Sequence, residues 1–236
     1  MTEDPRTIGT IRLLSWNIWK LFGDPLAVHR VLRAAEPDLV CLQEAPALPW
    51  STWQLAALAR ATGLHLVAGG RTAAGNAMLR SSRLQVYEAE AFRFRPLNWR
   101  IQRRGAVLAT VGLAGAPQLQ VAGVHLSLDP AERHAHVQEL VARLSANRLP
   151  SVVAGDLNEL AGGPSWQALA VVATDPAPDA AVTFTVARPH RRIDVVLTGP
   201  GIQTVEYGQW QPDLRDAALA SDHLPVLTLI RPPAPR

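Results

Sequence analysis

The sequence predicts an α/β fold in which packed β-sheets are flanked by helices. Short apolar runs of strand length are numerous, whereas stretches with apolar residues at helical spacing are few. The strands and helices also do not follow the strict alternation of a βαβ array. With 236 residues, 48% of them hydrophobic and 18% charged, the chain is long enough for one large domain with a substantial core.

The first half of the chain contains two predicted helices and six predicted strands. The helices cover residues 26–35 and 50–62. The first ends before Pro37, and the second closes on Gly63, a signal for a helix C-terminus. The strands are expected over residues 10–19, 39–43, 64–68, 77–80, 86–92 and 106–113.

The second half has a similar mixture. Helices are predicted over residues 130–144 and 164–170, and Pro130 suits the first turn of the longer one. The expected strands cover residues 119–126, 151–154, 193–198, 204–208 and 224–230. We therefore expect a single domain over residues 8–231, followed by a Pro-rich tail over residues 232–236.

Several classes of protein are disfavoured by what the sequence lacks. No run of 18 apolar residues is present, so we expect no membrane span. Residues 1–10 have no apolar core of a secretory signal. The single cysteine, Cys41, excludes an internal disulfide, and its apolar neighbours predict that it is buried. We expect a cytoplasmic monomer. No P-loop or dinucleotide-binding glycine motif follows a strand.

The positive charge is modest overall but locally concentrated. The net charge is +3, and Lys20 is the only lysine, so the many arginines are also consistent with a GC-rich gene. Residues 92–104, however, combine bases with aromatic side chains. These residues are Phe92, Arg93, Phe94, Arg95, Trp99, Arg100, Arg103 and Arg104. Such a segment could bind phosphates and stack on bases, or it could be a solvated loop and strand edge.

Polar residues recur where apolar strands end. Each alone is explained by a helix cap, a turn or a core histidine, but together they are acids, amides and two histidines at the rim of a sheet. The residues are Asn17, Glu44, His125, Asp156, Asn158, Asp194, Asp222 and His223. Oxygen ligands of this kind suit a hard cation, Mg²⁺ or Mn²⁺.

The residues of these motifs and the order in which they occur resemble those of a known family. The motifs are Ser15-Trp16-Asn17-Ile18, Gln43-Glu44, Gly75-Asn76-Ala77-Met78-Leu79, His125-Leu126, Gly155-Asp156-Leu157-Asn158, Arg192-Ile193-Asp194 and Ser221-Asp222-His223-Leu224-Pro225-Val226. The series closely resembles the endonuclease/exonuclease/phosphatase superfamily, the DNase I-like enzymes, over nearly the whole chain. That resemblance implies a four-layer α/β/β/α sandwich, with two mainly antiparallel mixed sheets covered by helices.

The resemblance also implies a metal side of the site. Glu44 would be the principal carboxylate ligand of Mg²⁺ or Mn²⁺, with Asn17 close by. Asp222 would add a second carboxylate on the metal side. A metal neutralises charge on the phosphate oxygens, as hydrolysis of a phosphodiester requires.

The other implied roles concern the phosphate and the attacking water. Asp156 would position or activate the nucleophile, and Asn158 would contact a phosphate oxygen. Asp194 would orient His223, which would contact the phosphate or act as a general base. His125 would be a phosphate ligand or the acid for the leaving group, and the resemblance leads us to expect an acidic partner for it, for which only location suggests Glu88 or Glu90.

Two further positions have open alternatives. Asn76 either reaches the substrate from a strand end or is a turn asparagine beside glycine. Arg104 either holds a phosphate or forms a structural salt bridge. Trp50 and Trp53 could contact lipid or a base, but we interpret them as the apolar face of the helix that follows.

We expect a metal-dependent phosphodiesterase or endonuclease that cleaves nucleic acid. The alternative is an enzyme acting on a phospholipid or a small phosphorylated metabolite, and a silent binding protein with the same fold comes last. The absence of a tryptophan-rich stretch before Arg192 disfavours repair of abasic DNA. The segment over residues 91–104 discriminates between substrates: arginines lining the cleft favour nucleic acid, and arginines pointing away favour a small substrate.

Overall fold

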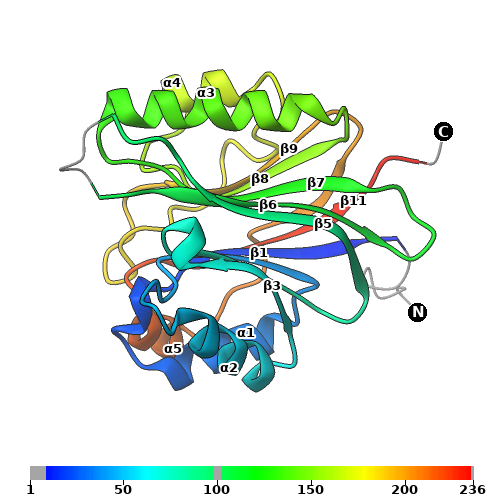
Figure 1. Ribbon diagram of the computed structural model, residues 1–236. Coiled ribbons are helices and arrows are strands. Elements are labelled where there is room, and N and C mark those ends of the chain that lie inside the picture. The colour runs from blue at the N-terminus through cyan, green and yellow to red at the C-terminus, as the bar shows by residue number, and fades with distance from the viewer. Residues whose placement is uncertain (1–8, 98–101, 235–236) are drawn as a thin grey trace.

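The computed structural model describes residues 9–97 and 102–234. Two β-sheets pack face to face, and helices cover their outer sides (Figure 1). Helices α3 (Pro130–Ala146) and α4 (Pro164–Leu169) lie on one outer face. Helices α1 (Pro25–Ala35), α2 (Ser51–Ala61) and α5 (Leu214–Ala220) lie on the other. The expected four-layer sandwich is confirmed.

The first sheet has six strands in the order β10-β11-β1-β2-β4-β3. Its strands are β1 (Ile11–Asn17), β2 (Leu39–Gln43), β3 (His65–Gly70), β4 (Asn76–Arg80), β10 (Gln203–Tyr207) and β11 (Val226–Arg231). Only the central pair, β1 and β2, is parallel. Two one-turn helices, η1 (Trp19–Leu21) and η2 (Arg71–Ala73), follow β1 and β3.

The second sheet has five strands in the order β5-β6-β7-β8-β9. They are β5 (Leu84–Arg93), β6 (Gly105–Leu113), β7 (Leu119–His125), β8 (Ser151–Asp156) and β9 (Asp194–Thr198). Here β7 and β8 are the parallel pair, because α3 connects them across the outer face.

Apolar side chains fill the space between the sheets and the space under each helical layer. Leu13, Cys41, Val121 and Val196 belong to the cluster between the sheets, so both sheets direct alternate residues inward. Cys41 is fully buried, as expected, and burial raises the pKa of its thiol to about 12. The thiol is therefore a packing group with no reactivity at neutral pH.

Strand register brings the predicted polar residues to one region. Asn17 pairs with Gln43 at the end of the parallel pair β1 and β2. In the other sheet, Asp156 pairs with both His125 and Asp194. Because β1 packs against β8 and β9 across the sandwich, the two sets of strand ends meet. The fold thus assembles the site from segments distant in sequence.

One helix was missed, and one expectation about a helix was wrong. Helix α5 was not predicted, although Asp213 caps it by accepting from the amides of Arg215 and Asp216. Trp53 is 82% exposed and Trp50 is 59% exposed, so they are not the buried face of α2. That face holds Leu55 and Leu58, and Trp53 lies two residues before Leu55, roughly 200° away around the helix.

The described part of the chain contains no helix that is both long and apolar enough to span a membrane.

Candidate active site

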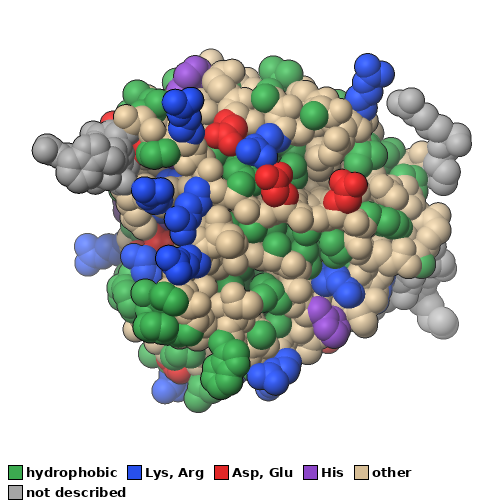
Figure 2. Space-filling model, in the orientation of Figure 1, with side chains coloured by type: hydrophobic (Ala, Val, Ile, Leu, Met, Phe, Trp, Pro, Cys, Tyr) green, Lys and Arg blue, Asp and Glu red, His purple; other side chains and the backbone are tan. Residues whose placement is uncertain are grey.

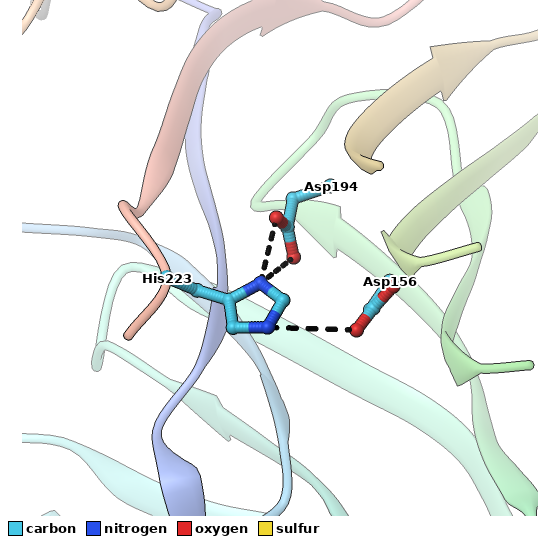
Figure 3. A group of neighbouring side chains, drawn as sticks. All are labelled: Asp156, Asp194 and His223. Carbon is cyan, nitrogen blue, oxygen red and sulfur yellow. Dashed lines mark hydrogen bonds and ion pairs between the residues drawn. The ribbon is translucent and has the colours of Figure 1, made fainter. Parts of the chain in front are cut away.

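His223 and Asp194 form a buried pair, as the sequence predicts. The Nδ1 atom of His223 donates to the Asp194 carboxylate, 2.9 Å from Oδ2 and 3.1 Å from Oδ1 (Figure 3). Burial lowers the pKa of His223, but the charge and hydrogen bond of Asp194 outweigh it and raise the pKa to about 9. Asp194 therefore fixes the ring orientation and leaves Nε2 facing the site.

Asp156 is the carboxylate toward which the other side chains converge. Its Oδ2 lies 3.9 Å from Nε2 of His223 and 3.3 Å from Nε2 of His125. The side-chain amide of Asn17 donates to the same oxygen over 3.3 Å. Burial, reinforced by the charge of Asp194, raises the pKa of Asp156. Such a carboxyl group is suited to accept a proton near neutral pH.

His125 has a basic partner where an acid was expected. Nη1 of Arg104 lies 2.9 Å from Nδ1 of His125, so Nδ1 is the acceptor and the Nε2–H of the neutral ring points toward Asp156. Burial, together with Arg104, His223 and Lys20, holds the pKa of His125 well below its usual value. Glu90 instead pairs with Arg143 at the surface.

Asn158 is held beside His125 by a tight turn after β8. Its backbone has φ of 51°, a left-handed conformation that asparagine tolerates well, and its amide donates to Oδ1 of Asp156 over 2.8 Å. The side-chain Nδ2 donates to the Leu126 carbonyl and lies 3.1 Å from Nε2 of His125. The Asp156–Asn158 motif is therefore a rigid unit.

A cavity of about 450 Å³ opens beside these residues. Glu44, Arg104 and His125 are among the residues that line it. Glu44 follows β2 with φ of 48°, and its carbonyl accepts from the amide of Lys20. A left-handed glutamate is strained by about 1–2 kcal/mol, which indicates that the surrounding structure holds it there.

Two sets of groups have the chemistry of a cation site. The Glu44 carboxylate lines the cavity, is 20% exposed and has Lys20 as an ionic neighbour at 3.9 Å. The ligand atoms of Asp156, Asp194 and His223 lie within 4.8 Å of one another. In the second set, however, Asp194 and His223 already bond each other. The carboxylate of Glu44 and the side-chain oxygen of Asn17, which also accepts from the Trp19 amide, are the kind of oxygen donors that a hard cation prefers.

The residues that hold the His223–Asp194 pair in place were not predicted from the sequence. Thr183 donates its hydroxyl to Oδ2 of Asp194 over 2.6 Å. Ser221 donates to the carbonyl of Asn17 and accepts from the amide of His223. The indole of buried Trp16 donates to the carbonyl of His223. Ser221 and Trp16 lie inside the motifs, but their hydrogen bonds cross the sheet and have no sequence signal.

Two predicted residues neither line the cavity nor take part in the described polar contacts with Asp156. Nδ2 of Asn76 donates to the carbonyls of Ala73 and Gly105, so this side chain anchors the residue next to Arg104. Asp222 is half-buried, and its carbonyl accepts from the amide of Val186. Neither is among the described residues that line the cavity. Contact of Asn76 with substrate and of Asp222 with metal stay predictions.

Of the described arginines in the basic segment, only Arg104 lines the cavity. Arg104 lines it and is 6% exposed, and its described contact is with His125. Arg93, in contrast, donates to the carbonyl of Arg71 at the surface. The expectations that fall on Trp99 and Arg100 lie outside the described residues.

A two-sheet sandwich whose strand ends join a carboxylate–imidazole pair to further carboxylates, amides and an arginine defines a phosphoester-hydrolase type of site. The comparisons agree, because residues 14–223 match the Endonuclease/Exonuclease/phosphatase family. The chain belongs to this family. No curated protein matches its sequence.

Solved structures share the fold at low identity. A functionally unknown conserved protein from Enterococcus faecalis V583 superposes with a TM-score of 0.80 at 18% identity, covering 94% of this chain and 100% of that one. A mannosyl-6-phosphatase from Bacteroides thetaiotaomicron gives 0.75 at 18% identity, covering 93% and 99%. ANGEL2, a 2',3'-cyclic phosphatase, gives 0.70 at 14% identity, covering 94% and 95%.

Proposed function

We propose that the protein is a divalent-metal-dependent phosphodiesterase that acts on a compact substrate. The observation that carries the proposal is the convergence of His223, His125 and Asn17 on Asp156, beside a cavity that contains Glu44. These groups can activate water and stabilise a phosphate together, whereas a binding protein needs no such proton acceptor.

Glu44 and Asn17 would hold the cation, and Asp222 is the further candidate. Bound Mg²⁺ or Mn²⁺ would supply Lewis-acid neutralisation of charge on a phosphate oxygen. Asp156 accepts the proton of the attacking water as its oxygen bonds to phosphorus. The ester P–O bond then breaks, and the leaving oxygen takes up a proton from solvent water.

The remaining residues bind the phosphate. His125 donates through Nε2, because Arg104 occupies its Nδ1, and Asn158 offers its amide from the neighbouring turn. His223 faces the same position with Nε2, while Asp194 stabilises its charged form. His125 is better suited to hydrogen-bond the phosphate than to protonate the leaving group, since its burial beside Arg104 opposes protonation.

A small substrate is favoured because few of the described arginines of the basic segment, residues 91–104, line the cavity. Only Arg104 of the segment's described arginines lines the cavity. Nucleic acid is the second candidate because Lys and Arg side chains gather on one side of the surface (Figure 2). A polyanion bound there would give activity that falls steeply with salt.

A substrate panel with Mg²⁺, Mn²⁺ or EDTA tests the proposal. The panel contains bis-p-nitrophenyl phosphate, plasmid DNA, single-stranded DNA, RNA and sphingomyelin. We expect hydrolysis of the small diester that EDTA abolishes and that 200 mM salt changes little. Activity that survives EDTA contradicts the metal requirement, and steeply salt-dependent cleavage of DNA or RNA alone favours the second candidate.

A further inference from the structure

We propose that the apolar part of the cavity wall binds an uncharged, largely apolar group that is esterified to the phosphate. This inference rests on the proposed function and names the substrate class for the same site. It assigns Phe22 and Leu48 as specificity-determining residues, since both line the cavity and neither belongs to the hydrolytic groups.

The cavity wall combines two chemically different sets of residues. One set carries charged groups and an imidazole: Lys20, Glu44, Arg104 and His125. The rest of the wall is mainly apolar and consists of Phe22, Ala45, Pro46, Ala47, Leu48, Ala74 and Gly75, together with the amides of Gln54 and Gln102. A ligand that contacts both sets should therefore join an anionic group to an apolar one.

A polar ester group would fit the apolar part of the wall poorly. Its described side chains that can hydrogen-bond are the amides of Gln54 and Gln102. A sugar brings several hydroxyls, and each hydroxyl that loses water without a new partner costs about 1–3 kcal/mol. The volume of about 450 Å³ is that of a small-molecule site, so the apolar group and the phosphate fit together.

The mouth of the cavity exposes apolar surface that such a group would cover. Phe22 is 69% exposed and Leu48 is 54% exposed. Phe22 packs edge-on against Trp19, and the ammonium of Lys20 lies 5.6 Å from its ring. An aromatic side chain thus lies directly beside a positive charge that lines the cavity. Hydrophobic and basic side chains also adjoin on this molecule's surface (Figure 2).

Calorimetric titration with phosphonates tests the inference without relying on turnover, because water attack at phosphorus does not cleave their P–C bond. In the presence of Mg²⁺, phenylphosphonate should bind about tenfold more tightly than methylphosphonate. In the double variant Phe22→Ser and Leu48→Asn, the preference should fall below about threefold while methylphosphonate affinity is kept. Both native side chains are largely exposed, so these substitutions leave the core intact.

Val171→Asn is the matched control. Val171 is 75% exposed and lies in a surface hollow with Ser151, at the start of β8 and thus at the opposite end from Asp156. The control should keep the native preference. A preference that survives in the double variant overturns the inference alone. Binding of neither phosphonate contradicts the proposed function as well.

An aromatic ring and a lipid chain could both supply the apolar group. Titration with phenylphosphonate and with hexylphosphonate distinguishes them. Tighter binding of either than of methylphosphonate supports the inference, and the tighter of the two identifies the source. If neither binds more tightly than methylphosphonate, the inference is contradicted.

Discussion

Each of the two active-site histidines has one contact at Nδ1 that sets the charge and the orientation of its imidazole ring. Asp194 holds Nδ1 of His223, while Arg104 holds Nδ1 of His125. The two histidines therefore differ: an acid favours the charged form of one, and a base together with burial favours the neutral form of the other.

Asp194→Asn should lower the imidazole pKa of His223. The carboxylate raises that pKa to about 9 against the effect of burial, so removing its charge leaves burial to act in the opposite direction. Nuclear magnetic resonance titration of the metal-free variant measures this directly. We expect a fall of at least one pH unit and a loss of kcat of about 100-fold. An unchanged pKa would disprove the proposed pairing.

Glu44→Gln should weaken binding of Mg²⁺. The substitution replaces the proposed carboxylate ligand of the cation with an amide of similar shape. Even residues that only support a metal ligand contribute about tenfold or more to metal affinity. Calorimetry should show an affinity loss of at least about tenfold. Glu88→Gln, at an exposed position on β5, should bind Mg²⁺ as the native protein does. Equal affinities in both variants would exclude Glu44 as a ligand.

At the scale of the elements, the close approach of β7 and β8 brings His125 and Asp156 together. A Cβ atom at Gly155 would overlap the carbonyl oxygen of Val124 on β7. Glycine is therefore required for the strand that delivers Asp156 to pair closely with its neighbour.

Gly155→Ala should destabilise the protein by about 1–3 kcal/mol, because the added methyl group forces the two strands apart. Urea unfolding measures the change. Gly112→Ala is the control: its Cβ would make only ordinary contacts, the nearest at 3.4 Å with Tyr87, so its stability should stay within about 1 kcal/mol. A similar loss in both variants would contradict the close-approach argument.

The helices and strands were mostly predictable from sequence, because each carries its own local pattern. The strand over residues 39–43 has the expected bounds, and the long helix begins at Pro130 as expected. Helix α5 was not predicted because its buried positions are the small residues Ala217 and Ala220, which give no strong apolar period. The contact of Arg104 with His125 depends on strand register, which no local pattern encodes.

At the scale of the whole molecule, a polar cluster fastens the two sheets at one edge. Tyr207 on β10 accepts from the amide of Val196 on β9, and these strands belong to different sheets. Arg192 lies 3.4 Å from the Tyr207 hydroxyl and donates twice to Asp175, over 2.7 Å and 2.8 Å. Arg192 thus has a structural role in the motif that it shares with Asp194.

Asp175→Asn should reduce stability at pH 7 by about 1–3 kcal/mol, with a smaller effect in acid. Burial raises the pKa of Asp175, but its bonds with Arg192 outweigh this and lower it. The stabilisation is therefore present above the unfolded pKa, about 3.9, and is lost as pH falls through the lower folded value. Urea unfolding of the native protein and of Asp175→Asn at pH 7 and pH 3.5 tests this. The same difference in unfolding free energy at both pH values would contradict it.

The most direct test of the central claim is the steady-state hydrolysis of bis-p-nitrophenyl phosphate by His223→Ala in Mg²⁺. His65→Ala is the control, since His65 is exposed at the start of β3. We predict that kcat/KM falls by about 100-fold or more in His223→Ala and keeps its native value in His65→Ala. A cooperative thermal unfolding transition should show that both variants are folded. Native activity in folded His223→Ala would contradict the account.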